Sequence, residues 1–247
     1  MIYYYIVLFI TQILHSIVGF GSTSIGIPFL SLALGAERSV LLLSTAGALL
    51  SLLIAITQRK DILYRELFII ILTIFPFMPI GFLLFSRLRP YDAILRLIMG
   101  TVVCLVASRE LWRRMVKNNH KDPPKGAVYT ALGVGAILEG MISMGAALIN
   151  FYALSRMKDK RNFRATMVAV WVFTNTVSTL FRAFILKAYS PPIWMGILYA
   201  IPLIFLAFFV GNKLHHKIPN ERFANVVYMI QLVSGVISIG GGVMLLL

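Results

Sequence analysis

An apolar stretch occupies residues 2–34, with the sequence IYYYIVLFITQILHSIVGFGSTSIGIPFLSLAL. As one continuous helix it would be about 50 Å long at about 1.5 Å per residue. The hydrocarbon core of a bilayer is only about 30 Å thick, so the stretch is too long for one span and short for two. We therefore expect a helix that crosses the bilayer, breaks at the glycine- and serine-rich residues 19–29, and returns as a shorter, re-entrant helix.

The composition indicates that lipid surrounds most of the chain. Hydrophobic residues make up 59% of the 247 residues and charged residues 13%, against about 45–50% and about 25% in soluble domains. These values exclude a soluble enzyme and a nucleic-acid-binding domain. Apolar runs occur at 2–19, 39–57, 67–86, 93–108, 127–142, 165–186, 193–211 and 223–247. We predict an all-α fold, a polytopic bundle of membrane helices.

The basic residues test how the chain crosses the membrane. The net charge is +14, and Lys and Arg lie in the loops between apolar runs, so we expect no nucleic-acid partner. If the broken segment of each half returns to its starting side, 17 of the 23 Lys and Arg residues share one side of the membrane. Eight simple crossings give no such bias. The positive-inside rule thus favours returning helices, inverted repeats and termini that face away from the cytoplasm.

The sequence also shows signs of an internal duplication. The longest polar stretch, WRRMVKNNHKDPPKG at residues 112–126, is predicted to be a basic linker between a first repeat, 1–111, and a second, 127–247. GFGSTSIGIPF at 19–29 has a counterpart in GMISMGAALINF at 140–151. GFLLFSRLRPYDA and GNKLHHKIPNERF align with an offset of 130 residues. We expect two similar repeats, each with a broken helix.

The two breaks are the predicted substrate site. A broken helix exposes backbone groups that lipid cannot satisfy, and a helix N-terminus favours an anion. Matching breaks in inverted repeats are typical of transporters, with the substrate near mid-membrane. The candidate binding residues are Gly19, Gly21, Ser22, Thr23, Ser24 and Gly26 in the first break and Ser143, Gly145 and Asn150 in the second. The alternative is that these small residues only allow helices to pack closely.

Polar residues near the breaks are further candidates. His15 and Glu139 directly precede the breaks and are candidates for proton coupling. The alternatives are a hydrogen bond to a neighbouring helix for His15 and an ion pair or a wet vestibule for Glu139. Arg164 and Asn175 are pathway candidates. For Arg164 the alternative is a solvated loop charge, and for Asn175 a hydrogen bond between helices.

Signatures of enzymes and of resident cofactors do not occur in the sequence. It contains no HExxH zinc motif, no phosphate loop and no GxSxG elbow. Its four histidines do not form a pattern of metal ligands. We therefore expect no enzymatic activity, no metal and no cofactor.

Three segments resemble a known family. They are GFGSTSIGIPFLSLALG at 19–35, EGMISMGAALINFYAL at 139–154 and FRATMVAV at 163–170. In these segments, and in its two-copy layout, the chain resembles the TauE/SafE sulfite-exporter family over nearly its whole length. The resemblance implies a duplicated bundle in the cytoplasmic membrane that acts as a permease for sulfite, a sulfonate or a related organosulfur anion.

Some positions depart from the family pattern. Serine and threonine occupy residues 22–24, where the family usually has more glycine, and Ala146 and Ala147 stand in the second break. These departures leave the identity of the substrate open. The alternative function is that of a non-transporting membrane protein that assembles or anchors a partner. Association into a homo-oligomer is compatible with the sequence.

Overall fold

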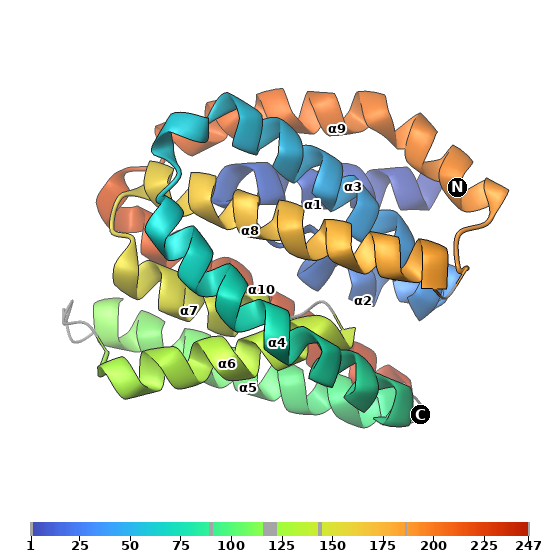
Figure 1. Ribbon diagram of the computed structural model, residues 1–247, viewed down its shortest axis with the longest axis horizontal. Coiled ribbons are helices and arrows are strands. Elements are labelled where there is room, and N and C mark those ends of the chain that lie inside the picture. The colour runs from blue at the N-terminus through green and yellow to red at the C-terminus, as the bar shows by residue number, and fades with distance from the viewer. Residues whose placement is uncertain (1, 89–90, 116–122, 143–144, 186, 247) are drawn as a thin grey trace. The chain divides into compact units, whose positions relative to one another are not determined.

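The computed structural model describes residues 2–88, 91–115, 123–142, 145–185 and 187–246, and every element in these ranges is helical (Figure 1). The α-helices are α1 (Ile2–Val18), α2 (Ser22–Leu34), α3 (Ala36–Thr57), α4 (Tyr64–Leu88), α5 (Asp92–Met115), α6 (Lys125–Ile142), α7 (Ala146–Arg156), α8 (Lys160–Leu180), α9 (Pro191–Lys217) and α10 (Asn220–Met244). A 3-10 turn (Arg59–Asp61) follows α3, and a π-helical turn (Phe181–Ile185) extends α8. The all-α prediction is confirmed.

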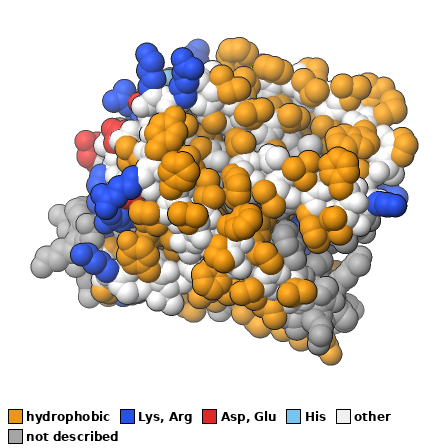
Figure 2. Space-filling model, in the orientation of Figure 1, with side chains coloured by type: hydrophobic (Ala, Val, Ile, Leu, Met, Phe, Trp, Pro, Cys, Tyr) orange, Lys and Arg blue, Asp and Glu red, His pale blue; other side chains and the backbone are white. Residues whose placement is uncertain are grey.

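The surface and the helix lengths are those of a membrane protein. Among the described residues, five helical segments are long and apolar enough to cross a membrane: Arg38–Thr57, Tyr64–Gly81, Lys160–Ile185, Pro191–Lys217 and Asn220–Met244. Apolar side chains cover much of the face in Figure 2, and Leu72 and Phe184 are 70% and 73% exposed. Because soluble monomers rarely expose large apolar patches, the fold is that of a multi-pass membrane bundle.

The chain forms two compact units, and each draws on both sides of the predicted linker. The first unit consists of Met1–Leu67 and Arg161–Ile218, and the second of Phe68–Lys160 and Pro219–Leu247. α5 continues to Met115 and α6 begins at Lys125. Residues 116–122 of the linker lie outside the described residues. The division into repeats at 1–111 and 127–247 stays a prediction.

The first unit contains the expected helix break. α1 ends at Val18 and α2 begins at Ser22. Gly19 and Gly21 have φ angles of 87° and 107°, in the left-handed region that glycine adopts without steric cost. α2 then returns antiparallel along α1. The evidence is that the hydroxyl of Tyr3, near the start of α1, donates to the carbonyl oxygen of Phe29, in the later half of α2, at 3.1 Å. Whether this return is re-entrant in a bilayer stays a prediction.

The second unit contains a similar hairpin, formed by α6 and α7. α6 ends at Ile142 and α7 begins at Ala146. The rings of Tyr129 and Tyr152 lie 5.5 Å apart. A Cβ atom on Gly135 would lie 3.0 Å from that of Leu148. Moving forward along α6 from Tyr129 to Gly135, the partner in α7 moves backward from Tyr152 to Leu148, so the two helices are antiparallel.

Each hairpin packs against a helix from the other side of the predicted linker. A Cβ atom on Gly211 of α9 would lie 2.9 Å from the carbonyl oxygen of Ile13 in α1. A Cβ atom on Gly81 of α4 would overlap the carbonyl oxygen of Ile137 in α6. Gly81 and Gly211 are the residues that the offset of 130 pairs in the sequence. Both glycines therefore allow a close approach of two helix backbones at matching places.

Candidate functional site

The most unusual charged side chain of the first unit is Arg164, in the second turn of α8. It is fully buried, with an exposed fraction of 0%. Its Nη1 donates to Oδ1 of Asn212 at 2.9 Å, and its Nη2 donates to Oγ of Ser16 at 3.5 Å. Its Nε has no hydrogen-bond partner among the described residues, and no carboxylate there forms an ion pair with it. A buried cation held only by neutral groups is costly, so this position favours an anionic ligand.

The first helix break lies directly against this arginine. A Cβ atom on Gly19 would lie 3.2 Å from both Cα and the carbonyl oxygen of Arg164. Such a contact is tighter than most Cβ contacts in proteins, and the φ angle of 87° at Gly19 also favours glycine. Arg164 therefore sits beside the predicted substrate segment, and its interpretation as a solvated loop charge is wrong. The reason is position along α8, because Arg161 in the first turn is exposed, whereas residues 163–168 are all buried.

α9 is held next to the break by two hydrogen bonds. Ser16 Oγ donates to the carbonyl oxygen of Phe208 at 3.2 Å. His215 Nδ1 donates to the carbonyl oxygen of Ile17 at 2.7 Å. Ser16 and Asn212 are site residues that the sequence did not single out. The available signal was weak, namely a polar residue beside His15 and a lone asparagine after Gly211.

His15 connects three helices of the first unit. Its Nδ1 is 2.8 Å from Oγ of Ser22 in α2, and its Nε2 is 2.9 Å from Oγ of Ser51 in α3. A serine hydroxyl both donates and accepts, so these two serines satisfy both nitrogens of a neutral imidazole. The structure therefore shows the alternative interpretation of His15, a hydrogen bond to neighbouring helices. Its role in proton coupling stays a prediction.

Other polar groups converge on the same place near Gly47 of α3. A Cβ atom on Gly47 would lie 2.9 Å from Oγ of Ser22, 3.8 Å from Nδ2 of Asn175 and 3.9 Å from Cε1 of His15. The predicted candidates Ser22 and Asn175 are thus brought together with His15 in a buried cluster. Of the remaining first-break candidates, Gly21, Ser24 and Gly26 are buried and Thr23 is half-buried.

Gln12 adds an unsatisfied amide to this unit. It is fully buried one turn before Ser16 in α1. Neither its Nε2 nor its Oε1 has a hydrogen-bond partner within the described ranges. A buried amide without partners costs free energy, so Gln12 is a group that a polar ligand or water would stabilise. Nothing in its sequence context indicated this.

The second break is chemically different from the first. Glu139 is 5% exposed, and its Oε2 accepts a hydrogen bond from the backbone N–H of Gly145 at 3.0 Å. The backbone N–H of Gly145 is therefore engaged by a carboxylate of the chain itself. Asn150 of α7 is fully buried, and neither of its side-chain amide atoms has a partner among the described residues. Ser143 lies outside the described residues.

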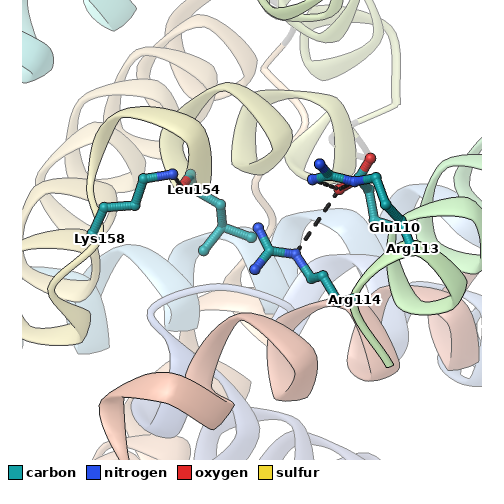
Figure 3. A network of polar contacts seen from close by, with 5 residues as sticks. All are labelled: Glu110, Arg113, Arg114, Leu154 and Lys158. Carbon is teal, nitrogen blue, oxygen red and sulfur yellow. Dashed lines mark hydrogen bonds and ion pairs between the residues drawn. The ribbon is translucent and has the colours of Figure 1, made fainter. Parts of the chain in front are cut away.

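Two arginines of the second unit, unlike Arg164 of the first, lie beside a carboxylate. Figure 3 shows Arg113 and Arg114, at the end of α5, both directed toward the carboxylate of Glu110. Arg113 Nη2 lies 2.6 Å from Oε2 of Glu110, and Arg114 Nε lies 3.9 Å from the same oxygen. Lys158 donates to the carbonyl oxygen of Leu154, near the end of α7. Arg164 is more deeply buried than Arg113 and Arg114, yet it has no such carboxylate within the described part of the chain.

Comparison with protein families identifies the chain. The family model described as Sulfite exporter TauE/SafE matches residues 4–238. The chain belongs to this family. As a family member, the TauE/SafE protein is a membrane transport protein of sulfur-anion type. The matched residues include Arg164 and both helix breaks. Comparison with curated proteins and with solved structures finds no significant match.

The position of Glu139 leads to a prediction about pH. We expect Glu139→Gln to abolish any pH dependence that the TauE/SafE protein shows with a substrate whose own charge is constant over the pH series, because a glutamine amide cannot exchange a proton yet keeps an oxygen for Gly145. Initial transport rates across a pH series in proteoliposomes measure this. The control is Glu221→Gln, since Glu221 is exposed at the start of α10. An unchanged pH profile in Glu139→Gln would remove this carboxyl group from the coupling mechanism.

Proposed function

We propose that this TauE/SafE protein is a secondary carrier for sulfite, a sulfonate or a related organosulfur anion in the cytoplasmic membrane. The observation that carries the proposal is Arg164, a fully buried guanidinium that has neutral partners and touches a helix break. A planar guanidinium matches the oxygens of an oxoanion and donates two parallel hydrogen bonds to them.

The surroundings of Arg164 suit an oxoanion. Ser16 and Asn212 place neutral polar groups beside the guanidinium. α2 begins at Ser22, directly after the break. Its N-terminus carries a partial positive charge, as helix N-termini do. Thr23 and Ser24 remain candidates for substrate contact on this segment. Asn150 and Gly145 remain candidates in the second break.

Transport requires that the buried site opens. Arg164 is sealed from solvent by α1, α8 and α9, so substrate reaches it only when packed helices move apart. We propose alternating access driven by an ion gradient or by the substrate gradient. His15 and Glu139 are the candidates for proton coupling.

Flux measurements in proteoliposomes test this function. The full-length protein is reconstituted and assayed with sulfite, several alkylsulfonates, sulfate and chloride on either side of the membrane. We expect saturable flux of at least one sulfur oxoanion above protein-free liposomes. Flux of no anion above that background would contradict the carrier and favour a non-transporting membrane partner.

A further inference from the structure

We infer that the Arg164 site selects singly charged oxoanions, such as hydrogensulfite and alkylsulfonates, over doubly charged ones, such as sulfate. This inference rests on the proposed function and adds the charge of the substrate to it. Its basis is that the site offers one buried guanidinium, which balances one negative charge. A second negative charge would be buried without a partner, which is strongly unfavourable.

Within the described part of the chain, the groups that contact Arg164 supply no further full charge. α1 contributes the hydroxyl of Ser16 and the backbone of Gly19, and α9 contributes the amide of Asn212. On α8 itself, Arg161 is exposed and Lys160 is partly exposed. Solvent screens such charges far more than it screens a buried one.

Two described histidines have hydrogen bonds close to the site. His15 lies between the hydroxyls of Ser22 and Ser51, and His215 donates from Nδ1 to the carbonyl oxygen of Ile17. Both are buried. A second buried positive charge beside Arg164 would be costly without a carboxylate, so neutral imidazoles fit this environment. The described side chains therefore present one full positive charge to a ligand at Arg164, to which the N-terminus of α2 adds only a partial one.

The test compares methanesulfonate with sulfate. Both have sulfonyl oxygens of similar geometry, but methanesulfonate carries one negative charge and sulfate two. Uptake of each radiolabelled anion is measured at equal concentration in proteoliposomes. We expect the rate constant for methanesulfonate to exceed that for sulfate by about tenfold or more, which corresponds to about 1.4 kcal/mol. Sulfate uptake that equals or exceeds methanesulfonate uptake would overturn the inference and leave the carrier function standing.

A second experiment applies if the protein transports sulfite but transports neither methanesulfonate nor sulfate. The sulfite rate is then measured against pH in the Glu139→Gln variant, in which that carboxyl group no longer titrates. We expect the rate to rise toward acid pH, in step with the fraction of hydrogensulfite. A rate that follows the doubly charged sulfite ion overturns the inference. Transport of no anion at all contradicts the proposed function itself.

A substitution links the selectivity to charge. Arg164→Lys keeps one positive charge but loses the planar pair of donors. We expect its methanesulfonate rate to fall while the preference over sulfate remains. A preference that disappears in Arg164→Lys would show that geometry selects the substrate, and would overturn the inference about charge.

Discussion

Replacing Arg164 with glutamine is expected to lower the initial rate of sulfur-oxoanion transport about a hundredfold or more. Removing one partner from a buried, hydrogen-bonded charge pair costs about 2–5 kcal/mol. The glutamine can still contact Asn212, but it offers no charge to the substrate. The measurement is the initial flux in proteoliposomes, with the amount of reconstituted protein determined for each variant.

A matched control and a stability measurement make this result specific. Arg161→Gln removes an exposed charge from the same helix, so we expect transport close to that of the unchanged protein. Arg164→Gln is expected to unfold at the same or a higher temperature, because it removes a buried cation that no carboxylate of the described residues balances. Transport by Arg164→Gln at the rate of the unchanged protein would exclude Arg164 from substrate binding.

Gly140→Ala is expected to disrupt the packing of the second unit. A Cβ atom on Gly140 of α6 would overlap the carbonyl oxygen of Met78 in α4 and lie 3.0 Å from its Cα. The obstacle is a helix backbone, which cannot rotate away as a flexible side chain does. Overpacking costs typically about 1–3 kcal/mol, and occasionally more, and we expect the upper end of this range. Thermal unfolding in detergent and size-exclusion profiles measure the effect.

Gly133→Ala is the control on the same helix. Nothing lies within 4 Å of a Cβ atom on Gly133, and alanine is favoured over glycine in a helix interior by about 1 kcal/mol. We expect unchanged or slightly increased stability and a normal elution profile. Equal behaviour of the two variants would mean that α4 and α6 do not pack as the structure shows.

The helix breaks could be predicted because their signal is local. The length of the apolar stretch and the glycines at 19 and 21 are both visible in the sequence, and both glycines adopt the left-handed backbone that requires them. The hydrogen bond between Glu139 and Gly145 could also have been predicted, since the two residues are only six positions apart in the sequence. Carboxylates are known to be stabilised near helix N-termini. The sequence prediction for Glu139 is proton coupling, and it does not include this contact.

The amino-acid sequence by itself established a lipid-embedded, all-helical chain with two helix interruptions, because hydrophobicity and glycine content act over a few residues. The tertiary structure alone decided which polar atoms meet. Arg164 binds Ser16, 148 residues away, and Asn212, 48 residues away. In the sequence Arg164 is one basic residue beside a basic turn. A side chain's charge is set by its residue type, but its burial and its partners depend on which helices pack together.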